Sequence, residues 1–258
     1  MKKKRFDDLV DIMARLRGAD GCPWDRRQTR ETLRPFLIEE TYEILEALDS
    51  EDDQGLREEL GDLLFHIIFM ARIAQEEGAF DIYDVINGIA EKMVRRHPHV
   101  FGNAEVSGPD EVEANWAQLK AEEKPRGSLM EGLPPHLPAL MRAYRLTQRA
   151  SKVGFDWEDR NQVWEKLEEE LEEFQEALGG GRAEDLREEL GDILFTLVNL
   201  ARFIDVDPED ALRRVTNKFA ERFHYIEQRL HEEGKDPHKA GLAEMDALWE
   251  ESKGDRGG

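Results

Sequence analysis

Acidic residues form a group whose spacing suits the binding of a metal ion. Glu39, Glu40 and Glu43 lie on one face of a predicted helix, and Glu59 and Asp62 lie one turn apart on the next. A short connection makes such helices antiparallel neighbours, so the carboxylates converge. Like charges at this spacing repel each other, and a hard divalent cation relieves the repulsion. Ligation by oxygen alone, without His or Cys, favours Mg²⁺ or Mn²⁺ over Zn²⁺.

The same acids recur 130 positions later, in an internal repeat. Segments 37–72 and 167–202 are identical at 18 of 36 positions without a gap, including a mid-helix glycine (Gly61 and Gly191). The acids of the second segment are Glu169, Glu170, Glu173, Glu189 and Asp192. Amphipathic helices share apolar spacing by chance, but they rarely share every acid as well. We interpret the repeat as a duplication.

The acids have two alternative interpretations. In a chain with 58 acidic residues, most runs of glutamate simply solvate a helix face. The repetition of the acids in register argues against simple solvation. A solvated helix face can carry its acids at any exposed position, whereas metal coordination needs them at fixed positions. A di-iron carboxylate bundle needs two Glu-x-x-His motifs, and the chain offers one, Glu221 to His224.

Each half also carries basic residues and a tryptophan at matching positions, one helical turn apart. The pairs are Lys92 and Arg96, Trp116 and Lys120, Lys218 and Arg222, and Trp249 and Lys253. In an acidic protein, cations near a metal cluster suit a bound polyphosphate, whose oxygens are shared between the metal and Lys or Arg. The alternatives are placement near a helix C-terminus or salt bridges to neighbouring glutamates for the cations, and core packing for the tryptophans.

Helical periodicity runs through nearly the whole chain and predicts an all-α fold. Residues 158–178, 185–204 and 209–233 have apolar stripes of helical period, and no long stretch alternates with period two. Asp207-Pro208 predicts a helix start, and Gly179–Gly181 and Asp49–Asp52 predict breaks.

The duplication predicts two tandem helical-bundle domains. We place them at residues 1–123 and 137–258, with a linker at 124–136 that is rich in Pro and Gly.

Composition excludes several classes of protein. The 258 residues carry a net charge of −22, so the chain lacks the basic surface of a duplex-binding protein, and we expect no nucleic-acid partner. A single cysteine excludes an internal disulfide framework and suits a reducing compartment. The longest apolar run, residues 63–71, is far too short to span a bilayer. We expect a cytoplasmic protein with no membrane partner.

Taken together, the motifs resemble those of the MazG-type nucleoside triphosphate pyrophosphohydrolases. The pattern Glu-Glu-x-x-Glu followed by Glu-x-x-Asp is present at 39–62 and again at 169–192. Segments 21–25 (Gly-Cys-Pro-Trp-Asp) and 218–223 (Lys-Phe-x-x-Arg-Phe) are also similar to this family. The likeness covers almost the whole chain, in the tandem two-domain form.

The resemblance implies an all-α fold, usually a homodimer. It also implies Mg²⁺-dependent cleavage of NTPs or dNTPs between the α- and β-phosphates, with a nucleoside monophosphate and pyrophosphate as products, and so a house-cleaning role in nucleotide pools. It implies three kinds of site residue. The metal ligands would be Glu170, Glu173, Glu189 and Asp192, and in the first repeat Glu40, Glu43, Glu59 and Asp62. The residues that orient or deprotonate the attacking water would be Glu169 and Glu39. The substrate-binding residues would be Lys218, Arg222, Trp249 and Lys253, and in the first repeat Lys92, Arg96, Trp116 and Lys120.

Both repeats keep every acid, so both are candidate sites. The second is slightly favoured, because Pro98 ends the first-half helix two residues after Arg96, whereas the Lys218–Arg222 helix runs on. The alternative from another class is a non-catalytic nucleotide-sensing or protein-binding helical module, which would bind NTP and Mg²⁺ without turnover.

Overall fold

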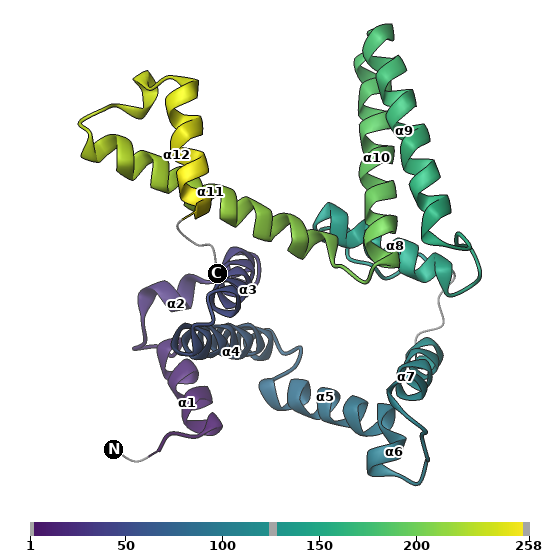
Figure 1. Ribbon diagram of the computed structural model, residues 1–258. Helices are drawn as coiled ribbons and strands as arrows, with labels where there is room; N and C mark the ends of the chain where they lie inside the picture. The colour runs from purple at the N-terminus through teal and green to yellow at the C-terminus, as the bar shows by residue number, and fades with distance from the viewer. Residues whose placement is uncertain (1–2, 124–127, 255–258) are drawn as a thin grey trace. The chain divides into compact units, whose positions relative to one another are not determined.

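The computed structural model describes residues 3–123 and 128–254, which contain helices and turns and no β-strand (Figure 1). The prediction of an all-α fold is confirmed. The chain divides into two compact units, residues 1–124 and 125–258. Of the predicted linker, residues 124–127 lie outside the described part, and the exact domain boundaries stay a prediction.

The first unit is built around a long pair of helices. Its elements are α1 (Phe6–Leu16), α2 (Pro23–Arg27), α3 (Arg34–Asp49), α4 (Asp53–Glu76), α5 (Ile82–Arg96), α6 (Pro98–Phe101) and α7 (Pro109–Glu123). Helices α3 and α4 pack along each other, α1 packs on α4, and α5 follows from the end of α4 (Figure 1). The apolar stripes face inward and form a core of Met13, Leu33, Ile68, Phe69, Ala71, Ile73 and Ile82.

Local signals in the sequence set the helix ends of this unit. The turn between α3 and α4 falls at the predicted break, and the side chain of Asp52 caps α4 by accepting a hydrogen bond from the backbone N–H of Gln54 at 3.0 Å. Asp81 caps α5 in the same way and forms a capping box with Asp84. Pro98 follows directly after the C-cap of α5, as predicted.

The second unit repeats the helix pair. Its elements are α8 (Ala139–Ser151), α9 (Arg160–Gly180), α10 (Ala183–Phe203), α11 (Pro208–Glu232), the 3₁₀ turn η1 (Pro237–Lys239) and α12 (Leu242–Gly254). Helices α9 and α10 lie along each other, α8 packs on α10, and α11 packs on α8 and α12 (Figure 1). Ile226, Leu230 and Leu248 are buried between α11 and α12.

Two helix boundaries of the second unit test the predicted start and break signals. Asp207 caps α11 by accepting hydrogen bonds from the backbone N–H groups of Glu209 and Asp210, with Pro208 in the first turn, as predicted. The glycine break is shorter than predicted, because α9 continues through Gly180 and ends at Gly181, whose φ of 80° is left-handed. One residue of positive φ is enough to end a helix, and glycine adopts it without strain.

The mid-helix glycines of the two repeats lie at corresponding places, in α4 and α10. Among the described residues, a Cβ atom at Gly61 or Gly191 would meet no neighbouring segment within 4 Å. No described helix combines the length and apolar character needed to cross a membrane.

Candidate active site

The helix pair of the first unit brings three of its predicted acids together. Glu40 and Glu43 project from α3 and Glu59 from α4, and one carboxylate oxygen of each lies within 4.8 Å of the other two. Glu40 and Glu59 are half-buried and Glu43 is exposed. The predicted convergence of acids across the α3–α4 pair is therefore present in this structure, with an open side toward solvent.

The second unit contains the same arrangement. One carboxylate oxygen each from Glu170, Glu173 and Glu189 lies within 4.8 Å of the others, across α9 and α10. Glu170 is only 5% exposed, so its carboxylate is largely shielded from water. A carboxylate in that position needs a positive partner.

The remaining predicted acids lie at the edges of these triads. Asp62 is outside the 4.8 Å group, but its charge is among the causes that raise the pKa of Glu43 and Glu59. Asp192 stands in the same relation to Glu189. Glu39 and Glu169 are exposed, next in sequence to a triad member, and Glu39 contributes to the raised pKa of Glu43.

Loss of hydration and mutual repulsion disfavour the charged forms of these acids. The pKa of Glu189 is raised, first by loss of hydration and then by the charges of Glu173, Glu170 and Asp192. In the first unit the pKa of Glu59 is also raised by loss of hydration, and then by the charges of the neighbouring acids Glu43, Glu40 and Asp62. A divalent cation among such oxygens removes the repulsion, and a set of carboxylates alone fits a hard ion. The clusters therefore fit a divalent metal, in accord with the sequence prediction.

Two residues that the sequence analysis did not single out contact the clusters. In the first unit, Nε2 of His66 lies 3.2 Å from Oε1 of Glu40, and the His66 ring stacks on Phe36. In the second unit, Nζ of Lys166 lies 2.8 Å from Oε1 of Glu169 and 2.9 Å from Oε1 of Glu170.

Helical spacing could have indicated the second contact, because Lys166 precedes Glu170 by four residues. The contact of His66 with Glu40 joins α4 to α3, so spacing within one helix does not indicate it. The two repeats differ at both positions, since Phe36 and Thr196 stand where Lys166 and His66 do in the other repeat.

The predicted phosphate-binding residues lie on other helices. Arg96 of α5 pairs with Glu123 and lies over the Trp116 ring, 5.3 Å from its centroid. Arg222 of α11 lies over the Trp249 ring in the same manner, at 5.4 Å. The spacing of cation and tryptophan is thus matched in the two units.

The other predicted cations are near these pairs in sequence. Lys92 is half-buried on α5, Lys218 is exposed on α11, and Lys253 pairs with Glu250 at 2.5 Å. The side chain of Lys120 lies outside the described residues. Among the side chains that the structure describes, no hydrogen bond or ion pair joins a predicted phosphate-binding residue to an acid of either cluster.

Comparison with known proteins finds one known domain over each half of the chain. A family model described as the MazG nucleotide pyrophosphohydrolase domain matches residues 28–101 and 159–226, and each match contains one acid cluster. The nucleoside triphosphate pyrophosphohydrolase/pyrophosphatase MazG of Thermotoga maritima is 47% identical over 251 residues, 96% of each chain. The nucleoside triphosphate pyrophosphohydrolase of Escherichia coli K12 is 42% identical over 255 residues, 96% of this chain and 97% of that one.

Among solved structures, a mazG-related protein from Thermotoga maritima is 32% identical, with a TM-score of 0.39, and covers 44% of this chain and 97% of its own. The two family matches and the full-length relatives confirm the resemblance and the enzyme class that the motifs predicted. The chain belongs to the MazG nucleotide pyrophosphohydrolase family, in a form that carries the domain twice.

Proposed function

We propose that this protein hydrolyses NTPs and dNTPs between the α- and β-phosphates, giving a nucleoside monophosphate and pyrophosphate, with Mg²⁺ as the metal and Mn²⁺ as a substitute. The observation that carries the proposal is the convergence of Glu170, Glu173 and Glu189 within 4.8 Å, repeated by Glu40 and its neighbours in the first unit. The names of the full-length relatives support the reaction.

The acids of the second cluster would serve as metal ligands. Glu170, Glu173, Glu189 and Asp192 would hold the metal. Bound Mg²⁺ polarises a phosphate and lowers the pKa of a bound water, which is the chemistry that this reaction needs. Glu40, Glu43, Glu59 and Asp62 would do the same in the first unit.

Glu169, and Glu39 in the first repeat, would act on the attacking water. The carboxylate of Glu169 accepts the proton as the water oxygen bonds to phosphorus, and the bond to the bridging oxygen breaks as pyrophosphate leaves. Lys166 holds one oxygen of this carboxylate at 2.8 Å, which fixes the side chain beside the ligands.

Lys218, Arg222 and Lys253 would bind the phosphates, with Trp249 packing near the nucleoside. Their first-repeat counterparts are Lys92, Arg96, Lys120 and Trp116. Cations near the bridging and leaving oxygens stabilise the charge that develops there. For this role α11 and α12 must approach an acid cluster, although α11 packs on α8 and α12 rather than along α9.

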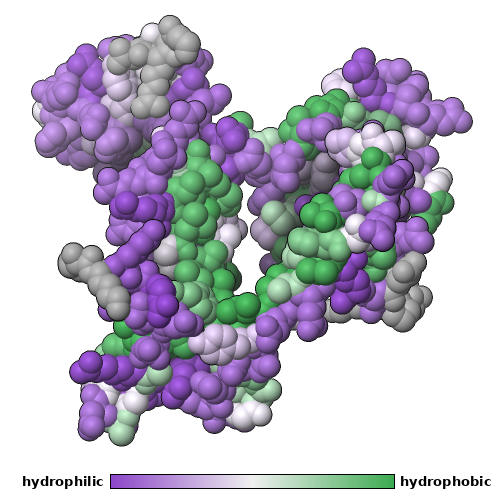
Figure 2. Space-filling view, turned by 90° about the horizontal axis from the view of Figure 1, so that it is seen from below, coloured by the Kyte–Doolittle hydropathy of each residue, from purple (hydrophilic) through white to green (hydrophobic). Residues whose placement is uncertain are grey.

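A homodimer would supply that approach and cover apolar helix faces. Leu212, Val215, Phe219 and Phe223 follow a helical stripe on α11 and are between 38% and 57% exposed. Leu190, Leu194 and Leu197 of α10 are also exposed, and Figure 2 shows hydrophobic residues in continuous surface patches. Exposed apolar area on this scale marks an interaction surface. We propose that a second copy of the chain covers these faces.

Incubation with a panel of NTPs and dNTPs tests the reaction. Monophosphate and pyrophosphate should appear in equal amounts, and only with Mg²⁺ or Mn²⁺ present. Diphosphate with orthophosphate as products would contradict the proposal, and so would turnover that survives removal of metal by a chelator. We place the activity in the cytoplasm, where removal of unwanted nucleotides from the pools would be its role.

A further inference from the structure

The predicted phosphate-binding arginine of the first unit already has a carboxylate on one of its donor edges. Nε of Arg96 donates to Oε1 of Glu123 at 3.1 Å, and a terminal nitrogen of Arg96 donates to Oε2 of the same carboxylate. The two side chains are only 11% and 19% exposed, and the face of the guanidinium lies over the Trp116 ring. Arginine binds phosphate through the same two-bond geometry, so Glu123 takes an edge that a phosphate would use.

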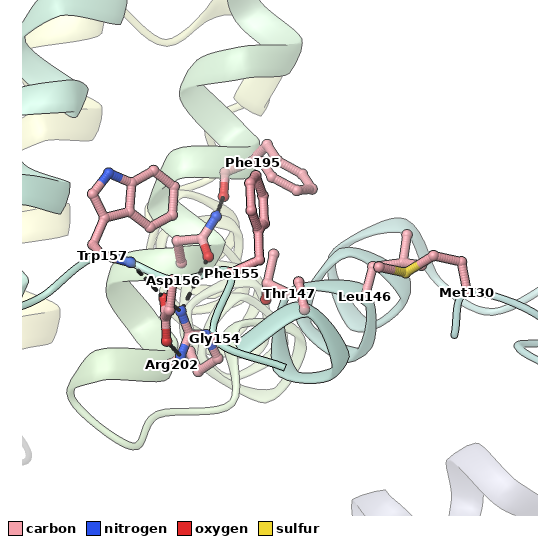
Figure 3. Close-up of a pocket in the computed structure, with 11 residues that line it drawn as sticks. Met130, Leu146, Thr147, Gly154, Phe155, Asp156, Trp157, Phe195 and Arg202 are labelled. Carbon is pink, nitrogen blue, oxygen red and sulfur yellow. Dashed lines mark hydrogen bonds and ion pairs between the residues drawn. The ribbon is translucent and has the colours of Figure 1, made fainter. Parts of the chain in front are cut away.

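The matching arginine of the second unit has no such partner. Arg222 lies over the Trp249 ring at 5.4 Å, but among the described residues no carboxylate pairs with it. Another arginine of this unit does form a two-bond pair. Arg202 donates to both oxygens of Asp156 in the wall of a cavity of about 640 Å³ that α8 and α10 line (Figure 3). The absence of a paired carboxylate is therefore particular to Arg222.

The repeats also differ in sequence at the position of this carboxylate. When they are aligned on Trp116 and Trp249, Glu123 corresponds to Arg256, which lies outside the described residues. A base thus replaces the acid in the second repeat. The cation over a tryptophan is common to both repeats, whereas the carboxylate on that cation belongs to the first alone.

A second arginine of the first unit holds the same carboxylate from the solvent side. Nε and a terminal nitrogen of Arg95 donate to Oε1 of Glu123 at 2.9 and 2.6 Å, and Arg95 is 54% exposed. These three groups together carry a net charge of +1, which attracts an anion, and Arg95 can keep Glu123 when a phosphate takes Arg96. Hydrogen bonds from Arg96 and then Arg95 lower the pKa of Glu123 to about 2, so its carboxylate is charged at neutral pH.

We propose that Glu123 competes with the phosphates of the substrate for Arg96 and gives the first site a lower affinity for triphosphate than the second, an inference that rests on the proposed function. A binding group that must first leave an internal partner lowers the apparent affinity by the fraction of time that it is free. The two sites therefore work over different ranges of triphosphate concentration, although their acid clusters are alike.

The test uses the full-length chain carrying Glu173→Gln, which disables the second cluster, so that turnover comes from the first. In this parent, Glu123→Gln removes the charge of the competing group and keeps its size. Glu123→Asp keeps the charge on a shorter side chain, which weakens the pair without removing it. Glu113→Gln, on an exposed acid of the same helix α7, changes the net charge equally and is the matched control.

Glu123→Gln should lower KM for ATP about tenfold, the scale of one charge-assisted pair that no longer has to be broken. Substrate and transition state gain equally, so kcat should stay unchanged. Glu123→Asp should give an intermediate KM, and Glu113→Gln should leave it as in the parent. Adding Arg96→Ala should abolish the effect of Glu123→Gln. An unchanged KM in Glu123→Gln overturns the inference, and so does a raised KM, which would show that Glu123 positions Arg96 for the substrate.

Calorimetric titration with inorganic triphosphate and Mg²⁺ separates failure of this inference from failure of the proposed function, because it needs no turnover. Arg222→Ala is added to the parent, so that binding reports on the first unit. If ATP is not cleaved at all, the proposed function fails, and triphosphate binding about tenfold tighter in Glu123→Gln still supports the competition at Arg96. Equal triphosphate binding with and without Glu123→Gln contradicts it.

Discussion

Nζ of Lys166 lies 2.9 Å from Oε1 of Glu170, one helical turn away on α9 and within the second acid cluster. The carboxylate raises the pKa of Lys166, after the larger effect of Glu169, so the ammonium stays charged. A metal bound by Glu170 would therefore compete with this cation for the same carboxylate. In the first repeat Phe36 stands at the position of Lys166. The side chain that contacts Glu40, the counterpart of Glu170, is His66.

Replacing Lys166 with Met should tighten Mg²⁺ binding at the second cluster. After screening by solvent, removal of a competing positive charge from a partly exposed ion pair is worth about 1 kcal/mol, or about fivefold in affinity. The Mg²⁺ concentration that gives half-maximal activity should fall accordingly, while kcat falls because Glu169 loses its anchor. Lys152→Met, on an exposed lysine outside the clusters, is the control. An unchanged or weaker Mg²⁺ requirement would show that Lys166 does not compete.

Millimolar Mg²⁺ should raise the melting temperature of the protein. The clustered carboxylates repel one another in the metal-free chain, and a ligand that binds only the folded state stabilises it by about 2.7 kcal/mol at one hundred times its Kd. For a chain of two domains this corresponds to a shift of a few degrees. Scanning fluorimetry with and without Mg²⁺ measures the shift. A variant with Gln at Glu40, Glu43, Glu170 and Glu173 should melt at the same temperature in both buffers.

Single-site knockouts should show which cluster turns over. Glu173→Gln removes a ligand charge from the second cluster and Glu43→Gln does so in the first, and metal activation is worth several kcal/mol. If both sites work, each single variant keeps about half of the pyrophosphate release and the double variant keeps almost none. Complete loss in Glu173→Gln alone would mean that the first cluster is silent. Full activity in the double variant would show that the site is misassigned.

Two inactive variants should restore activity when mixed, if a second copy brings the cations to the acids. The experiment uses a parent that carries Glu43→Gln, so that only the second cluster turns over. In this parent Lys218→Ala weakens phosphate binding and Glu173→Gln weakens the metal site, and each should lower turnover by at least tenfold. In a mixed dimer one of the two sites regains both groups, so up to about a quarter of the parent's activity should return. A mixture no more active than its components would place both groups of a site in the same chain.

Acid should weaken the contact between α5 and α7 through Glu123. Hydrogen bonds from Arg96 and then Arg95 lower the pKa of Glu123 to about 2, below its ordinary value of 4.5. The folded carboxylate thus stabilises the protein above pH 4.5, and that contribution fades as the pH falls from about 4.5 towards 2. Urea unfolding at pH 6 and at pH 3.5 should show a smaller pH effect in Glu123→Gln than in wild type. High salt should reduce the effect in wild type, because the groups are close to solvent.

Local spacing in the sequence predicted the acid clusters. The other contacts of the candidate site depend on packing between helices, which local spacing does not predict. Glu40, Glu43 and Glu59 converge because helical periodicity and one short turn fix their geometry. The contact of His66 with Glu40 spans 26 residues and depends on how α4 rotates against α3. The placement of Arg222 depends on where α11 packs, which no spacing within α11 records.

The glycines of α4 and α10 have a consequence for how these helices behave. A glycine inside a helix costs about 1 kcal/mol relative to alanine. Within the described chain, no neighbouring segment lies close enough to Gly61 or Gly191 to exclude the methyl group of an alanine. Each glycine stands between the two predicted metal ligands of its helix. Gly61 lies between Glu59 and Asp62, and Gly191 lies between Glu189 and Asp192. The helical turn that presents the carboxylates therefore contains a residue of low helix propensity. We expect α4 and α10 to be locally less stable at this turn, where a ligand has to be bound and then released.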